Sequence, residues 1–288
     1  MPGMEHMHQG ASFSAMWSPG ILLLTILLGW LYFYLVGAGR HRFQDSSPVG
    51  ARKKTYMVLA LVTLYIGQGS PLNYYGHADL FSAHMMQQSL LYLVMPPLVL
   101  LAIPEWLLKP LLDKPFVKKW IYPLFHPLLT VLVFNMLFSM YHIPTIFEYS
   151  MSHPSLHVAY HLVLLVTAFH MWFPVFCPVA GWQRISDLQK LAYLVADGIL
   201  LTPACACIIF ANSVIYGTYA DEFTSYLPPL DDQQLGGTIM KIVQEIVYGA
   251  ALAYVFFKWY RKERKKDREE EELSDAELLQ RTNLSTHT

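Results

Sequence analysis

Long apolar segments constrain this chain more than any other feature of its sequence. A helix needs about 20 consecutive, mostly apolar residues to cross the roughly 30 Å hydrocarbon core of a bilayer. Seven segments approach or exceed this length: residues 20–38, 55–71, 81–103, 121–140, 156–177, 190–212 and 237–258. Charged residues make up 14% of the chain, against roughly 25% in soluble domains. The sequence therefore predicts an all-α, polytopic membrane protein with seven transmembrane helices.

The lysines and arginines alternate between the links that join these segments. They gather in the links after the first, third and fifth segments and in the C-terminal tail. The N-terminal segment and the links after the second, fourth and sixth segments contain none. Because cytoplasmic links are enriched in these residues, the N-terminus is predicted outside and the C-terminus inside. This orientation requires an odd number of spans, which agrees with seven.

Three parts of the chain follow from this pattern. Residues 1–18 form an external leader that contains methionines and histidines, residues 19–260 form the transmembrane domain, and residues 261–288 form a charged cytoplasmic tail. No basic region precedes the first span, so it is expected to stay in the membrane instead of being cleaved as a signal peptide. No phosphate-binding loop, hydrolase triad or zinc-protease motif is present, and the links are too short for a catalytic domain. We therefore expect no enzyme activity and no nucleic-acid partner.

Histidines gather at the predicted outer level of three consecutive spans. His84 lies near the start of the third span, His142 follows the fourth, and His157 and His161 open the fifth. His157 and His161 are four residues apart, so both project from one face of a helix. His153 precedes that helix and is read as a cap. Because ionisable groups within a membrane are rare and mark functional sites, these histidines are predicted to ligate a metal or a cofactor.

Methionines accompany the histidines and indicate which metal they would bind. Met85 and Met86 follow His84. The leader supplies four further candidate ligands: Met4, His6, Met7 and His8. Imidazole combined with thioether ligands favours copper, particularly Cu(I), over cations that prefer oxygen. The alternative is a haem, since histidines on facing helices can ligate its iron axially.

Other polar groups within the spans are assigned structural roles. Lys241 and Glu245, four residues apart, are predicted to form an ion pair that faces the bundle. A deeper set in the inner half of three spans could form a polar relay or only interhelical hydrogen bonds, which we favour: His126, His170 and Asp197. Cys205 and Cys207 project about 200° apart on a helix and are read as small apolar residues.

Particular residues in three spans resemble a known family. They are His84-Met85-Met86-Gln87 in the third span, Tyr141 after the fourth, and His157 with His161 in the fifth. Together they resemble the multi-spanning Bacillus-type CtaG assembly factors of bacterial cytochrome c oxidase, and the resemblance extends from the first to the seventh span. The family's histidine pattern falls on His84, His157 and His161. Where many relatives have a second histidine, this chain has Gln88, so Met85, Met86 or His142 would complete the ligand set, or fewer imidazoles would serve.

The resemblance implies a non-enzymatic assembly factor in the plasma membrane of a bacterial cell. Its partners would be the lipid bilayer and a subunit or assembly intermediate of caa-type haem–copper oxidase. Its role would be to handle copper for the binuclear centre through the outer histidines and methionines. Two other classes are open: a haem-binding or electron-transfer membrane protein that uses the same histidines, and a small-solute permease with Asp197, Lys241 and Glu245 along its path.

Overall fold

The computed structural model describes residues 12–220 and 227–285, and every regular element within these ranges is helical, as the sequence predicts. The long helices are α2 (Pro19–Val36), α3 (Ala51–Gly69), α8 (Pro127–Tyr141), α10 (Pro154–Phe176), α11 (Asp187–Ile209) and α12 (Pro229–Ser285). Another long helix consists of three consecutive pieces, α5 (Phe81–Ser89), the π-helical turn η2 (Leu90–Val94) and α6 (Met95–Ala102). The shorter helices are α1 (Phe13–Met16), α4 (Pro71–Ala78), α7 (Glu105–Leu112) and α9 (Pro144–Met151). Single turns lie at η1 (Ala38–Arg42), η3 (Val117–Ile121), η4 (Tyr122–Phe125), η5 (Ala180–Trp182) and η6 (Gly217–Tyr219).

Several of these helices are long and apolar enough to cross a membrane, which indicates a membrane protein. By length and composition, the described residues contain five such helices: α2, Phe81–Ala102, α10, α11 and the Pro229–Leu273 part of α12. The number rises to six if Val117–Phe125 and α8, which meet at 67°, are taken as one bent span. The segment predicted at residues 55–71 forms the continuous helix α3 but is not among these. Seven spans and the orientation of the chain stay predictions.

Prolines set the starts of many helices. A proline at the first helical position is favourable because the N–H that it lacks would have no partner there. Six of the described helices begin in this way, namely α2, α4, α8, α9, α10 and α12. The start of α11 is stabilised differently, by a capping box in which Ser186 and Gln189 each accept a hydrogen bond from the other's backbone N–H.

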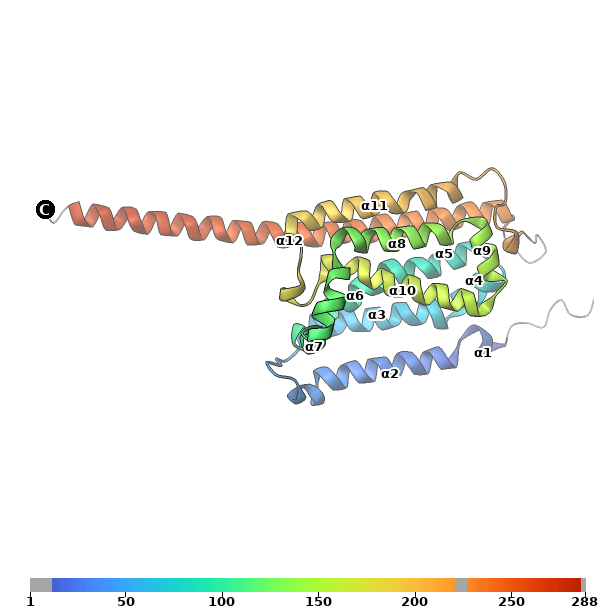
Figure 1. The fold of residues 1–288 in the computed structure, drawn as a ribbon, viewed down its shortest axis with the longest axis horizontal. Helices are drawn as coiled ribbons and strands as arrows, with labels where there is room; N and C mark the ends of the chain where they lie inside the picture. Colours follow the sequence, from blue (N-terminus) through green and yellow to red (C-terminus); the bar gives the residue numbers. More distant parts are fainter. Residues whose placement is uncertain (1–11, 221–226, 286–288) are drawn as a thin grey trace, which may run out of the picture.

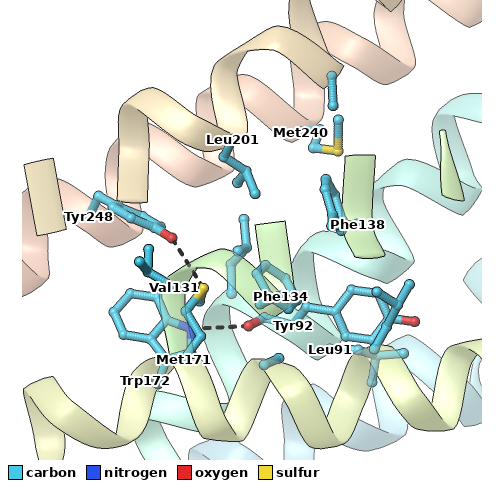
Figure 2. Close-up of a cluster of buried hydrophobic side chains, with 14 of the residues drawn as sticks. Leu91, Tyr92, Val131, Phe134, Phe138, Met171, Trp172, Leu201, Met240 and Tyr248 are labelled. Atoms are coloured by element: carbon cyan, nitrogen blue, oxygen red, sulfur yellow. Dashed lines mark hydrogen bonds between the residues drawn. The ribbon is translucent and has the colours of Figure 1, made fainter. Parts of the chain in front are cut away.

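The helices run side by side along the long axis of the molecule (Figure 1). Helix α12 packs against α11 and α5, α8 packs against α10, and α3 packs against α6 and α2. Helix α2 lies at one edge, and the charged end of α12 extends beyond the bundle (Figure 1). The main core between the helices is built from aromatic and aliphatic side chains, among them Phe134, Phe138, Trp172 and Leu201 (Figure 2).

In the helix formed by α5, η2 and α6, a tryptophan side chain replaces a backbone donor that a proline lacks. In an α-helix the Tyr92 carbonyl would accept from the N–H of residue 96, but Pro96 has none. Trp172 of α10 instead donates its indole N–H to Tyr92 O at 3.1 Å (Figure 2). The helix also widens into the π-turn η2 at this level, a distortion often found at functional sites. Trp172 thereby fixes the position of Tyr92 relative to α10.

Polar contacts from the last part of the chain hold the end of the bundle at which α4, α5 and α9 meet. The carboxylate of Asp232 on α12 accepts hydrogen bonds from the backbone N–H of Phe81 at 2.7 Å and from the Ser82 hydroxyl. This carboxylate thereby caps the start of α5. Tyr219 of η6 donates its hydroxyl proton to Gly76 O on α4. A Cβ at Gly76 would lie 3.0 Å from the backbone nitrogen of His84, so this glycine permits the close approach of α4 to α5.

Candidate functional site

Four histidines from three helices come together at this end of the bundle. We use the name histidine cluster for His77 of α4, His84 of α5, and His157 and His161 of α10, together with Gln88, Tyr92 and Tyr141. Their ring centroids are 4.3 Å apart for His157 and His161, 4.9 Å for His77 and His157, and 5.5 Å for His84 and His161. His84 is fully buried and His157 is 7% exposed. The predicted residues His84, His157 and His161 therefore share one site.

The local helices explain why these side chains meet. His84, Gln88 and Tyr92 are spaced four residues apart along α5 and η2, which places them on one stripe. His157 and His161 have the same spacing on α10 and form the facing stripe. Tyr141 is the last residue of α8 and closes the space between the two stripes.

A chain of hydrogen bonds runs from Gln88 through His84 to Tyr141. The Gln88 amide donates to His84 Nε2 at 2.8 Å, so this nitrogen is an acceptor. The Tyr141 hydroxyl oxygen lies 3.1 Å from the same nitrogen. The neutral His84 ring then carries its proton on Nδ1, which is buried and without a partner in the structure.

The same chain continues from Tyr141 to His161. The Tyr141 hydroxyl also pairs with His161 Nε2 at 3.1 Å. His161 Nδ1 in turn pairs with the Tyr92 hydroxyl at 2.5 Å. Both ring nitrogens of His161 are therefore paired, each with a tyrosine, and the two contacts hold the orientation of the ring.

A second set of contacts leaves a free lone pair on His157. His77 donates its Nδ1–H to Asn73 O at 2.9 Å. In the neutral ring its Nε2 is therefore an acceptor, and it accepts a hydrogen bond from His157 Nε2–H, with the two nitrogens 3.0 Å apart. The neutral His157 ring then has its lone pair on Nδ1, and this atom is buried and without a hydrogen-bond partner. A neutral imidazole nitrogen with a free lone pair is the form that binds metal ions.

A cleft of about 660 Å³ reaches this site from the side of the bundle. The polar residues in its lining are Gln68, Asn73, Tyr74, His77, Gln87, Tyr92, His157 and His161. The opposite wall is apolar and includes Ile21 and Leu24 of α2 and Leu64 of α3. Among the described residues, no lysine, arginine or carboxylate lines the cleft, so a cation that enters meets only neutral donors from them.

The other predicted ligands lie outside the histidine cluster. His142 contacts Phe138 with ring centroids 4.4 Å apart and donates Nδ1–H to Phe138 O at 2.7 Å, which leaves its Nε2 unpaired. Met85 lies fully buried in the apolar core, and Met86 is half-buried. The leader residues Met4, His6, Met7 and His8 lie outside the described residues. His153 faces outward and bonds Tyr149 O at 2.9 Å.

The structural assignments are partly met. Lys241 and Glu245 form an ion pair at 2.6 Å, and Lys241 also donates to Thr202 Oγ1 at 2.9 Å. Glu245 is 64% exposed, so the pair lies on the outer surface of the bundle and not inside it as predicted. Only the Lys241 end of the pair contacts α11, through Thr202, while the Glu245 carboxylate one turn further along α12 is exposed. Cys205 is buried and Cys207 exposed, as their opposite directions on α11 require.

The deeper polar set does not form a relay among its own members. Asp197 accepts from Asn135 Nδ2 at 2.6 Å and from the Tyr248 hydroxyl at 2.7 Å. His170 donates to Leu124 O at 2.8 Å, and His126 is the N-cap residue of α8. No hydrogen bond joins Asp197, His126 and His170 to one another in the described part of the chain.

Tyr92 and His77 of the histidine cluster were absent from the predicted ligand set although the sequence carries a signal for each. Tyr92 lies eight residues after His84, a spacing that repeats on one helix face. His77 lies seven residues before His84. The helix is interrupted between α4 and α5, and this interruption brings His77 against His157. Within the described residues, no group of three or more His, Cys, Asp and Glu side chains is arranged to hold a metal ion.

Comparison with known proteins gives one match. No curated protein and no solved structure matches the chain. The family model for the cytochrome c oxidase caa3 assembly factor, Caa3_CtaG, matches residues 30–262. This range includes the histidine cluster and all the helices that form it. The chain therefore belongs to the Caa3_CtaG family of cytochrome c oxidase caa3 assembly factors.

Proposed function

We propose that this protein is a non-catalytic assembly factor that holds copper as cargo at the histidine cluster and passes it to a subunit or assembly intermediate of the oxidase. The observation that carries the proposal is the lone pair of His157 Nδ1, which is buried, unpaired and close to three other imidazole rings. Soft or borderline nitrogen donors with no carboxylate nearby suit copper better than cations that prefer oxygen.

Copper would displace hydrogen bonds when it binds. His84 and His161 are held by Tyr141, so each ring has to give up a phenol contact before its nitrogen can reach a metal. His157 requires no such exchange at Nδ1. We therefore place first contact at His157, with His161, His84 and His77 joining it by rotation of their rings. Ligands that return to tyrosine partners suit cargo that has to be released.

Metal analysis of the purified protein tests this assignment. The His157→Ala/His161→Ala variant should bind at least tenfold less copper under reducing conditions than the wild type. In cells, the same variant should lower caa-type oxidase activity while its amount in the membrane stays unchanged. His153→Ala is the matched control, because His153 precedes the same helix but bonds outside the cluster.

Three outcomes would count against the proposal. Unchanged copper binding and oxidase activity in the double variant would remove the histidines from the function. Equal losses in His153→Ala would indicate a general effect on the start of α10. A Soret absorption band in the purified wild-type protein, lost in the double variant, would assign the same histidines to haem instead of copper.

A further inference from the structure

A second cleft lies at the opposite end of the bundle, where α3 and α11 begin, α10 ends and α12 leaves the core (Figure 1). It has a volume of about 250 Å³. Its lining contains four cationic side chains, from Arg52 and Lys53 of α3, Lys190 of α11 and Lys258 of α12. None of the described residues that line it is an aspartate or a glutamate. This basic cleft is thus far more positive than the cleft beside the histidine cluster.

Few of these charges are neutralised within the structure. Lys190 is 2% exposed and pairs with Asp187 at 3.1 Å. Lys53 donates to Leu101 O and Ile103 O at 3.1 and 3.0 Å, which are neutral acceptors. Arg52 bonds the Tyr56 hydroxyl at 2.8 Å and lies over the Tyr254 ring. Lys258 forms no ion pair with any described residue. Of the four cations, only Lys190 therefore forms an ion pair with a described carboxylate.

The N-terminal dipoles of α3 and α11 add to this positive potential, while the C-termini of α6 and α10 at the same cleft oppose it. Arg52 and Lys53 lie in the first turn of α3, and Lys190 lies in the first turn of α11. Helix N-termini carry a partial positive charge and disfavour lysine and arginine in the first turn. Three cations placed against this preference, around one cavity, are suited to an anion that binds between them.

An apolar groove lies beside the basic cleft. It has a volume of about 290 Å³ and runs between α6 and α12, where its lining includes Pro97, Leu98, Ile246 and Ala250. Leu101, Phe176 and Tyr254 line both cavities, so the two are adjacent. A basic cleft next to an apolar groove matches a molecule with an anionic head and a hydrocarbon chain.

We propose that this composite cavity binds one anionic phospholipid, with its phosphate among Arg52, Lys53, Lys190 and Lys258 and an acyl chain in the groove beside Ala250. Basic pockets between transmembrane helices are suited to such head groups. The arginine can meet two phosphate oxygens at once, and the lysines act as point charges. The proposal does not depend on copper binding, because it uses no residue of the histidine cluster.

Lipid retention in nanodiscs tests the proposal. The full chain is reconstituted in dioleoyl-phosphatidylcholine with a small fraction of dioleoyl-phosphatidylglycerol, and the lipid that stays bound after re-extraction is quantified by mass spectrometry. Wild-type protein should retain phosphatidylglycerol over phosphatidylcholine. Each cationic residue contributes about a fivefold preference near a membrane surface, so Arg52→Gln/Lys258→Gln should lower retention about 25-fold. Lys258→Gln alone should lower it about fivefold and serves if the double variant does not fold.

A matched control and a groove variant separate the possible explanations. Lys265→Gln/Arg268→Gln removes the same charge from the exposed part of α12 and should leave retention unchanged. Ala250→Trp should fill the groove and lower retention of the lipid while binding of inorganic phosphate, measured by calorimetry, stays the same. Equal losses in the control would show general surface attraction and overturn the site. Equal retention of both lipids, or phosphate binding as strong as that of the lipid, would also overturn the proposal.

Discussion

The histidine cluster and the polar group around Asp197 both lie among the helices, yet they differ in how their titratable side chains are paired. Asp197 is fully buried, and each of its carboxylate oxygens accepts one hydrogen bond, from Asn135 or from Tyr248. The histidine cluster leaves His157 Nδ1 and His84 Nδ1 unpaired and borders a cleft of about 660 Å³. A buried polar group without a partner costs free energy, so its retention beside a cleft indicates a ligand. The Asp197 group also leaves one buried atom unpaired, Asn135 Oδ1, but its titratable carboxylate is fully paired, which suits a structural role.

Replacing Asp197 should give the largest loss of stability. The Asp197→Ala change leaves the Asn135 amide and the Tyr248 hydroxyl without their acceptor. Interhelical hydrogen bonds of this kind contribute about 1 kcal/mol each, and an unpaired donor adds to the cost, so we expect a loss of about 2–3 kcal/mol. Thermal unfolding in detergent measures it. Copper bound per folded chain should stay at the wild-type level.

Asp197→Asn provides the conservative control for this change. The amide oxygen can still accept from Tyr248, so most of the stability should be retained. If Asp197→Ala abolished copper binding in the folded protein, the Asp197 group would belong to the functional site and the contrast between the two regions would fail.

The sequence predicts the helical framework well because helix ends depend on local residues. Pro19 and Pro154 mark starts that agree closely with the predicted spans 20–38 and 156–177. The start of α12 was placed too late because its first turns are polar. Asp232 and Gln233 are buried there by tertiary partners, the N-terminus of α5 and the Ile215 N–H, which local sequence does not reveal.

The histidine cluster was predictable only in part, for a similar reason. Helical spacing brings His157 and His161 onto one face, and alternation of the spans brings His84 to their level. Tyr92 counts as apolar in a hydropathy pattern, so its hydroxyl contact with His161 was missed. Met85 was expected beside the histidines, but it lies one position from His84, about 100° around α5, and is buried in the core.

Removing the Tyr92 hydroxyl tests the histidine cluster, as removing the Asp197 carboxylate tests the other polar group. The Tyr92→Phe change deletes the hydroxyl that pairs with His161 Nδ1 and holds the orientation of the ring. Loss of such an outer partner of a metal ligand weakens metal binding about 10- to 100-fold, so copper affinity should fall by about tenfold with little change in thermal stability. Competition with a Cu(I) chelator measures the affinity.

Tyr160→Phe is the matched control for Tyr92→Phe. Tyr160 donates to Leu137 O at 3.0 Å and bonds no histidine. Its removal should leave copper affinity unchanged. A tenfold loss of affinity in both variants would mean that any disturbance of the aromatic residues affects the site, and the specific role of the hydroxyl on His161 would be wrong.

The smallest effect is expected at Trp172, which lies between the two regions. Its indole donates to Tyr92 O, and its ring contacts Tyr248 with centroids 5.2 Å apart (Figure 2). Trp172→Phe keeps an aromatic ring but leaves the Tyr92 carbonyl without its donor, since Pro96 cannot supply one. We expect a loss of about 1 kcal/mol in stability and about a twofold loss of copper affinity, because Tyr92 shifts but keeps its hydroxyl. Combining Trp172→Phe with Tyr92→Phe should then add nothing to the tenfold affinity loss of Tyr92→Phe alone, since the indole acts on the site only through that tyrosine. An additional loss of copper affinity in the double variant would show that Trp172 also affects the histidine cluster by a route that does not pass through Tyr92.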